Sequence, residues 1–361
     1  MTALLPFSTR LLDWFDRHGR HDLPWQHPRT PYRVWISEIM LQQTQVQTVI
    51  GYFERFMAAF PTLGALASAS EDEVLALWAG LGYYARGRNL HRAARELVAA
   101  GQHELPGTLE GLMALPGVGR STAGAILSMG FGRRGVILDG NVKRVLCRHR
   151  AIRSWAGERQ TEQQLWQLAE ALTPTERACD YTQAIMDLGA TVCRRRNPLC
   201  EACPVREDCL AHAQNLTDSL PVPKPRKTVP ERSVVALILH DEQGRVLVER
   251  RPGSGIWGGL WCPPLSGWDV PAEQARAQLA SRFGLAADAL TGLPGFQHTF
   301  THFRLHVVPV GRRVGVEWMD QMLTRQDQDA PLSAVQARTE THGLPAPFRR
   351  WLTHSLSGEQ A

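Results

Sequence analysis

Four of the seven cysteines crowd into one short stretch, and this feature constrains the fold more than any other. They are Cys193, Cys200, Cys203 and Cys209, with the spacing C-x6-C-x2-C-x5-C. Four unrelated buried cysteines seldom lie so close together, whereas four thiolates complete a tetrahedral zinc site or hold one iron–sulfur cube. The spacing predicts a loop tied to one metal centre. The chemistry of four thiolates does not decide between a zinc ion and an iron–sulfur cluster.

The bulk composition is that of a globular chain with a mild excess of positive charge. Its 361 residues favour two domains over one. Hydrophobic residues make up 43% of the chain, enough for sizeable cores, and the net charge of +5 permits a nucleic-acid partner without requiring one. No segment is long enough to span a bilayer, and residues 1–17 lack the uninterrupted apolar core of a signal peptide. We therefore expect a cytoplasmic protein with no membrane partner.

The pattern of apolar residues changes after residue 216. Before this point, apolar positions recur at helical intervals of three and four, for example over 46–59, 72–79 and 161–172. Residues 217–231 contain four prolines and no periodic pattern, which is typical of an extended linker. Later apolar or alternating runs predict strands at 234–239, 245–249 and 303–310 and a helix at 271–283. The sequence thus predicts an all-α domain over 1–216 and an α+β domain over 232–361.

A glycine-bearing turn lies about twenty residues before an isolated carboxylate. The turn, Leu115–Gly119, reads LPGVG, and its glycines Gly117 and Gly119 allow close approach to a surface. Backbone amides at the start of the following helix can bind a phosphate, although such a turn alone is weak evidence. Asp139 follows an apolar stretch and precedes a helix, so it is either a plain N-cap or a carboxylate held beside a substrate.

An early helix carries a second carboxylate in apolar surroundings. Thr30 and Pro31 form an N-cap and first-turn pair that opens a helix running through Glu38. Apolar residues flank Glu38 at positions −3, +1 and +3, which weakens the alternative of an exposed glutamate on an amphipathic helix. A carboxylate among apolar side chains is costly unless it is protonated or paired. Burial raises its pKa, which suits a general acid at neutral pH.

The order of these features resembles that of the helix-hairpin-helix DNA glycosylase superfamily. The turn, Asp139 and the four cysteines occur in that order, and the likeness covers nearly the whole first domain. Members of the superfamily carry a 4Fe-4S cluster on cysteines in this arrangement, so the resemblance implies that cofactor here. The stretch SEIMLQQTQV is similar to the adenine-specific branch, in which the glutamate that corresponds to Glu38 is catalytic.

One departure from the bifunctional members of this superfamily bears on the activity. In those members a lysine follows the hairpin and attacks the sugar to form a Schiff base. This chain has Gly119-Arg120-Ser121, and a serine cannot form an imine. We therefore expect base removal without efficient strand cleavage. Asn141 and Lys143 follow Asp139 and are expected to contact DNA, the plain alternative for Lys143 being a solvated face.

The implied chemistry uses both carboxyl groups on one extruded nucleotide. Adenine leaves poorly as an anion, so Glu38 would protonate a ring nitrogen while the bond between C1′ and N9 breaks. The sugar gains oxocarbenium character, which Asp139 would stabilise electrostatically or by transient attachment, as paired carboxylates do in glycoside hydrolysis. Water then completes the reaction, and the products are an abasic site and free adenine.

A base inside a duplex is out of reach and has to be flipped out, so the enzyme must fill the gap. Gln42 and Gln43 follow Glu38 by about one helical turn, and Tyr83 lies on a glycine-softened loop near Arg86. In the family, the corresponding glutamine and tyrosine enter the base stack near the lesion. The resemblance implies this role for Gln43 and Tyr83, the alternative for the tyrosine being a place in the core.

The C-terminal half resembles a Nudix fold of the kind appended to adenine glycosylases. Trp257–Trp261 resembles the glycine-rich segment that leads into a strand of that fold. A Nudix hydrolase carries a glutamate-rich helix, whereas residues 271–284 here contain only one acidic residue, Glu273. We therefore expect a binding platform rather than a pyrophosphohydrolase. In relatives a Phe-Ser-His loop reads the oxidised guanine opposite adenine. Phe300, Thr301 and His302 align with it, and threonine keeps the hydroxyl donor.

The sequence thus predicts a monomeric adenine-specific glycosylase acting on double-stranded DNA with adenine opposite 8-oxoguanine or guanine. The alternatives are a thymine or oxidised-pyrimidine glycosylase, an inert DNA-binding scaffold and a nucleotide pyrophosphohydrolase. The presence of Glu38 with no lysine at position 121 disfavours the first. Retention of both Glu38 and Asp139 disfavours the second, and the acid-poor C-terminal helix disfavours the third.

Overall fold

The chain folds into two compact units in a computed structural model that describes residues 4–225, 229–253, 255–300, 302–324, 331–336 and 343–355. The first unit comprises Met1–Ala69 and Asn89–Arg226, and the second comprises Ser70–Arg88 and Lys227–Ala361. The second unit therefore includes a segment from the helical half of the chain. Among the described residues, no helix combines the length and apolar character that a membrane crossing requires.

The helical half is built from short helices with two π-helical turns. In chain order they are α1 (Phe7–His18), η1 (Pro24–Gln26), α2 (Pro31–Leu41), α3 (Val46–Ala59), α4 (Leu63–Ser68), α5 (Glu71–Trp78), α6 (Ala85–Ala99), α7 (Leu109–Met113), α8 (Arg120–Ala125), η2 (Ile126–Gly130), α9 (Gly140–His149), α10 (Arg159–Leu172), α11 (Ala178–Asp187), η3 (Leu188–Val192), η4 (Cys200–Ala202) and α12 (Leu210–Ala213). The predicted all-α character of this half is confirmed.

Capping residues begin the two helices that carry the predicted carboxyl groups. Thr30 caps α2, its side chain accepts a hydrogen bond from the backbone N–H of Arg33, and Pro31 is the first helical residue. Asp139 caps α9 and accepts from the backbone N–H of Val142 at 2.8 Å. Both helix starts agree with the sequence-based prediction.

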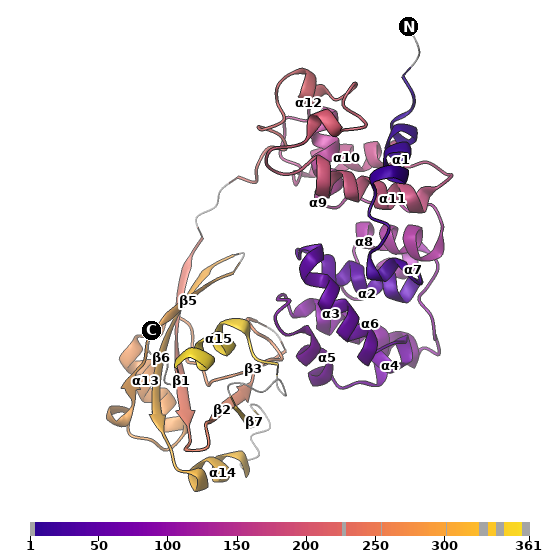
Figure 1. The fold of residues 1–361 in the computed structure, drawn as a ribbon. Helices are drawn as coiled ribbons and strands as arrows, with labels where there is room; N and C mark the ends of the chain where they lie inside the picture. The colour runs from indigo at the N-terminus through magenta and orange to yellow at the C-terminus, as the bar shows by residue number, and fades with distance from the viewer. Residues whose placement is uncertain are drawn as a thin grey trace. The chain divides into compact units, whose positions relative to one another are not determined.

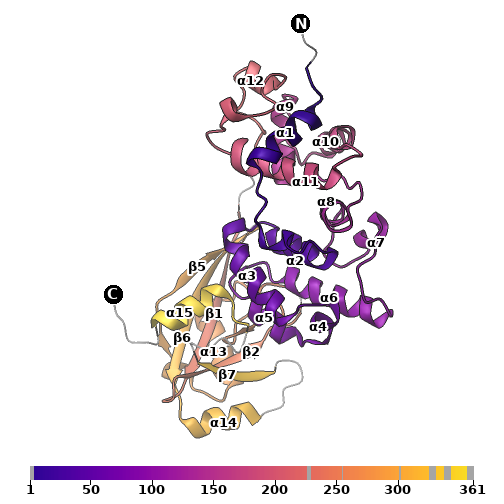
Figure 2. The same ribbon diagram turned by 45° about the vertical axis from the view of Figure 1, so that its right-hand side comes forward.

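Two groups of helices pack in the first unit. Helix α2 packs against α3, α8 and η2, so Glu38 lies on a helix in the middle of the bundle. Helix α9 packs against α10, α11, α12 and η3, and α1 covers α11. Both ribbon views show α1, α9, α10 and α11 gathered together and α2 beside α3 (Figure 1, Figure 2). The carboxyl end of α11 and the turn η3 connect this second group to the cysteine loop.

The C-terminal half is a mixed sheet with helices, as predicted. Its elements are β1 (Glu231–His240), β2 (Arg245–Arg250), β3 (Trp261–Cys262), α13 (Ala272–Arg282), η5 (Ala287–Ala289), β4 (Thr291–Gly292), β5 (Phe296–Thr299), β6 (Arg304–Arg313), α14 (Val316–Thr324), β7 (Leu332–Gln336) and α15 (Ala346–Ser355). The strand order is β3-β2-β1-β6-β4, with β5 beside β6 and β7 beside β2. The central pair β1 and β6 is parallel, and the other pairs are antiparallel.

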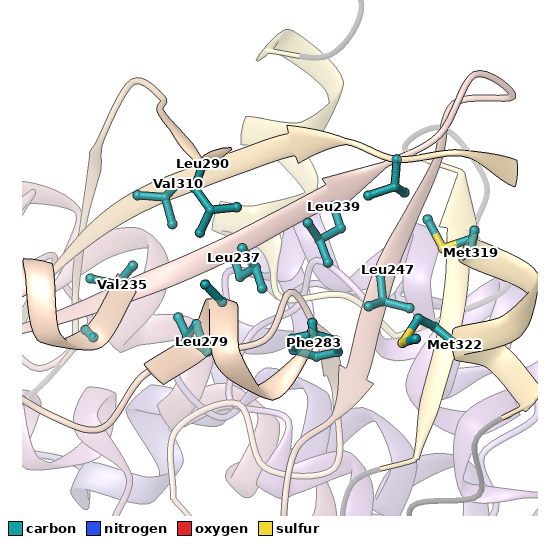
Figure 3. Packing of buried hydrophobic residues seen from close by; sticks show 13 residues of the cluster. Val235, Leu237, Leu239, Leu247, Leu279, Phe283, Leu290, Val310, Met319 and Met322 are labelled. Carbon is teal, nitrogen blue, oxygen red and sulfur yellow. The ribbon is translucent and has the colours of Figure 1, made fainter. Parts of the chain in front are cut away.

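Strand β1 is buried on both faces, which explains why 234–239 reads as an uninterrupted apolar run. On one face Leu237 and Leu239 pack with Leu279 of α13 and with Phe283, the residue after that helix, in a hydrophobic core that Figure 3 shows from close by. On the other face α15 lies over β5, and the rings of Phe348 and Phe296 meet edge to face with centroids 5.3 Å apart.

Candidate active site

Glu38 and Asp139, far apart in sequence, line the same pocket of the helical unit. The pocket is partly open to solvent and has a cavity volume of about 220 Å³. Its apolar wall is formed by Leu23, Trp25, Leu41, Val46 and Met186. Its other polar lining residues are Arg20, Gln42, Thr44, Ser121, Thr122, Asn141 and Gln183. The structure therefore brings together the two carboxyl groups singled out from the sequence.

The side chain of Glu38 is held in the neutral form by its surroundings. Burial raises its pKa to about 8, and the charge of Asp139 adds to the rise. Among the described residues no hydrogen bond to its carboxyl group is found. At pH 7 most Glu38 side chains therefore carry a proton, which is the form a general acid needs.

Asp139 is desolvated as well, but donors surround it. Its Oδ1 accepts from the Val142 backbone N–H at 2.8 Å, and its Oδ2 accepts from Asn141 Nδ2 at 3.4 Å. Burial raises its pKa, while these hydrogen bonds and the charge of Arg144 oppose the rise. Hydrogen bonds to a carboxylate favour the ionised form, so the donors around Asp139 oppose the rise of its pKa, whereas the pKa of Glu38 is raised without such opposition.

A chain of hydrogen bonds joins Asp139 to the first cysteine of the loop. Asn141, the donor to Asp139, accepts from Arg144 Nη2 at 2.8 Å. Arg144 also donates from Nε to the carbonyl oxygen of Cys193 at 2.8 Å and from Nη2 to that of Gly189 at 2.7 Å. Helix α9 thus carries the catalytic candidate at its N-terminus and a contact to the cysteine loop one turn later.

The predicted hairpin is formed by α7, the turn and α8. Gly117 has φ of +79°, and a Cβ there would lie 3.0 Å from Cβ of Asn89. Gly119 caps α8, and a Cβ there would meet no atom within 4 Å, so this side of the turn is open. Ser121 Oγ accepts from the backbone N–H of Leu138 at 2.9 Å, which ties the hairpin to the residue before Asp139.

The other predicted DNA contacts of the helical unit differ in their surroundings. Gln42 lines the pocket and donates from Nε2 to Thr122 Oγ1 at 3.4 Å. Gln43 is exposed and has φ of +59°. Lys143 is in an ion pair with Glu162, with Nζ 2.6 Å from Oε1, and does not line the pocket. Its predicted contact with DNA stays a prediction.

Tyr83 is presented on a braced turn of the second unit. Its side chain is 47% exposed and its φ is +49°. The buried Arg86 donates from Nη2 to the carbonyl oxygens of Leu81 and Gly82, and its guanidinium lies 5.5 Å from the Tyr83 ring centroid. Tyr84 is buried instead, so one tyrosine of the pair belongs to the core and the other is exposed, while the predicted role of Tyr83 in the base stack stays a prediction.

Phe300 is fixed in an aromatic cluster of the same unit. Its ring lies 4.5 Å from that of His298, 4.7 Å from that of Phe303 and 5.6 Å from that of Trp257. His302 is exposed, and its ring contacts that of Phe303 edge to face. Thr301 lies outside the described residues. These ring contacts pack the Phe300 side chain, and its predicted role in reading the lesion stays a prediction.

The four cysteines of the loop all line one further pocket, and Arg148 lines it with them. Arg148 Nη1 lies 3.5 Å from Cys193 Sγ, and burial raises the pKa of Cys203 to about 12. Within the described parts of the chain, no three His, Cys, Asp or Glu side chains converge closely enough to hold a single metal ion. The four thiols line one shared pocket, which suits a group that takes all four as ligands, and the identity of that group stays a prediction.

Sequence reasoning missed three polar residues of the pocket region, Arg20, Gln183 and Asp187. Arg20 and Gln183 line the pocket, and both donate to the fully buried Asp187. A signal was present in the sequence: Asp187 interrupts the apolar stretch AIMDLGA, and a buried carboxylate requires partners. The identity of those partners depends on the packing of α11 against the segment after α1.

Comparison with known proteins agrees with this geometry. Residues 36–171 match the HhH-GPD superfamily of base excision DNA repair proteins, and residues 234–354 match the NUDIX domain. The adenine DNA glycosylase of Buchnera aphidicola subsp. Schizaphis graminum is 36% identical over 304 residues, which cover 84% of this chain and 86% of that protein. The human adenine DNA glycosylase is 40% identical over 358 residues, which cover 83% of this chain and 65% of that protein.

Among solved structures, a thermostable thymine-DNA glycosylase superposes with a TM-score of 0.51 and 27% identity, over 58% of this chain and 95% of the other. That match confirms the helical glycosylase fold. The NUDIX match and the mixed sheet confirm the expected Nudix-like second half.

Proposed function

The chain belongs to the adenine DNA glycosylase family of base excision repair enzymes, and from this premise we propose its substrate and mechanism. The substrate is duplex DNA in which adenine is paired with 8-oxoguanine or guanine. The reaction is hydrolysis of the N-glycosidic bond after the adenosine has been flipped into the pocket between α2 and α9. The protein acts on this DNA as a monomer.

The observation that carries the proposal is that the carboxyl groups of Glu38 and Asp139 line the same pocket. With a pKa of about 8, Glu38 donates a proton to a ring nitrogen of adenine at neutral pH. Departure of the neutral base leaves positive charge on the sugar, and the hydrogen-bonded Asp139 stabilises that charge. Glu38, now deprotonated, accepts a proton from the attacking water, so the group is restored at the end of the cycle.

The position of Ser121 supports base removal without strand cleavage. Its hydroxyl oxygen is the acceptor for Leu138 N–H and carries no amine that could attack the sugar. The product is an abasic site in an otherwise intact strand.

We further propose that Cys193, Cys200, Cys203 and Cys209 hold a 4Fe-4S cluster. When bound, the cluster supplies structural support by closing the loop after η3. Burial raises the pKa of Cys203 and Cys209, and a bound cluster would favour the thiolate forms of these ligands. Arg148 and Arg144 hold the carbonyl oxygens of this loop, so the support extends along α9 towards Asp139.

The test is base release from duplexes with adenine opposite 8-oxoguanine or guanine. We expect wild-type protein to release adenine and leave sites that break only on alkali treatment. Glu38→Gln should lower the single-turnover rate by at least a thousandfold, with duplex affinity within threefold of wild type. Normal turnover by Glu38→Gln, or base release from thymine mispairs alone, would contradict the proposal.

A further inference from the structure

We propose that Asp187 is a positioning residue that makes the pocket selective for a purine with an amino group at position 6. It does so by fixing the side-chain amide of Gln183 with its carbonyl oxygen facing the bound base. The inference rests on the proposed function, because it assumes that a purine enters the pocket lined by Gln183.

Asp187 is a buried carboxylate whose hydrogen-bond capacity is filled from two directions. It is the last residue of α11, where the helix passes into the π-helical turn η3, and its side chain is fully buried. Its Oδ2 accepts from the Arg20 backbone N–H at 2.7 Å. Its Oδ1 accepts from Arg20 Nε at 2.9 Å, Arg20 Nη2 at 2.6 Å and Gln183 Nε2 at 2.8 Å. The ion pair with Arg20 offsets the cost of burying the charge.

This carboxylate decides which way the amide of Gln183 points. A glutamine amide has one end that donates and one end that accepts, and packing alone distinguishes the two ends poorly. An ionised carboxylate only accepts, so Nε2 must face Asp187 and Oε1 must face away from it. Within the described residues, no hydrogen bond to Oε1 is found, and Gln183 lines the pocket. The pocket wall therefore presents an acceptor.

An acceptor at this place distinguishes adenine from purines with an oxygen at position 6. Adenine carries an N6 amino donor, whereas guanine and hypoxanthine carry an O6 acceptor on the same edge. The amino group can donate to Gln183 Oε1. An O6 atom would face that oxygen without a proton between them, which leaves two buried acceptors unsatisfied and lowers the rate for such a base by about ten- to a hundredfold.

Arg20 also holds Asp187 in place, and its own backbone is fixed by further hydrogen bonds. Its backbone carbonyl oxygen accepts from Gln26 Nε2 at 3.0 Å, and Gln26 Oε1 accepts from Leu23 N–H at 3.2 Å. Leu23 lines the pocket. Asp187 thus lies at the junction of α11 and the segment after α1, which form neighbouring parts of the pocket wall.

The experiment measures single-turnover release of adenine and of hypoxanthine, each opposite 8-oxoguanine, and compares the ratio of the two rates between proteins. Comparison of ratios removes the intrinsic difference in leaving ability of the two bases. Asp187→Asn, whose amide can donate to Gln183 and allow its rotation, should lower the adenine-to-hypoxanthine ratio at least tenfold. Thr191→Val is the matched control, because Thr191 Oγ1 donates only to the backbone oxygen of Asp187 at 2.8 Å. It should keep the wild-type ratio.

A second variant keeps the test decisive if Asp187→Asn folds poorly. Gln183→Met removes the amide but retains Asp187, and it should lower the ratio as much as Asp187→Asn does. In the Gln183→Met background, Asp187→Asn should change the ratio no further. Equal loss of both rates in Asp187→Asn, or a wild-type ratio in Gln183→Met, would overturn the proposal. Failure of the proposed function is distinguishable, since the wild-type protein would then release no adenine.

Discussion

Replacement of Glu38 by glutamine should stabilise the protein at neutral pH while it abolishes activity. The pKa of Glu38 is about 8, against an ordinary value of 4.5 that applies in the unfolded chain. At pH 7 folding must therefore add a proton to this group, and each unit between 4.5 and 7 costs about 1.4 kcal/mol. This proton uptake destabilises the folded protein by about 3 kcal/mol at pH 7 and has no effect below pH 4.5. Glutamine has a similar shape and takes up no proton, so it avoids this destabilisation.

The assay is denaturant unfolding of wild type and Glu38→Gln at pH 5 and pH 8, with the metal-loaded proteins. The variant should gain less than about 1 kcal/mol at pH 5 and about 4 to 5 kcal/mol at pH 8, because this destabilisation grows until pH reaches the folded pKa. Glu162→Gln is the control; its partly exposed ion pair with Lys143 is worth at most about 1 kcal/mol at either pH. An equal gain for Glu38→Gln at both pH values would refute the reasoning.

Three further predictions concern the reaction and the cysteine loop. The single-turnover rate should be level below about pH 8 and fall tenfold per unit above it, because only protonated Glu38 donates; a rate that rises through pH 8 and 9 would contradict this. Arg144→Met should lower the rate of base release at least tenfold with duplex affinity within threefold, since it breaks the link between Cys193 and Asn141. Arg148→Met leaves the buried carbonyl oxygen of Leu220 and the partly buried ones of Arg194 and Arg195 without this donor. It should cost about 1 to 3 kcal/mol in unfolding free energy and lower the bound iron per chain; full iron content and wild-type stability would exclude this role.

Local signals in the sequence predicted the parts of the fold that depend on local chemistry. The Thr30–Pro31 pair marked the start of α2, and the polar residue after an apolar run marked Asp139 as the cap of α9. The uninterrupted run at 234–239 predicted a strand, and burial on both faces explains that pattern. These features depend on residues a few positions apart, so spacing and residue type suffice to find them.

Other features depend on packing between distant segments and left little trace in the sequence. That Arg20 and Gln183 share Asp187 follows from the packing of α11 against the segment after α1, which no spacing rule gives. Ser70–Arg88 likewise groups with the C-terminal unit. The sequence gives no sign of this, because the helical pattern of apolar residues continues before and after this segment. Lys143 could be a DNA contact by sequence alone, and only the structure shows its ion pair with Glu162.

The two carboxyl groups of the pocket differ because the elements that carry them differ. Glu38 lies within α2, where the backbone amides are used by the helix itself, so nothing on its own helix stabilises an anion. Asp139 lies at the N-terminus of α9, where a free amide and the helix dipole favour negative charge. Desolvation raises the pKa of both carboxyl groups. The hydrogen bonds that the helix N-terminus offers oppose this rise only for Asp139, so Glu38 is the better placed of the two to hold a proton.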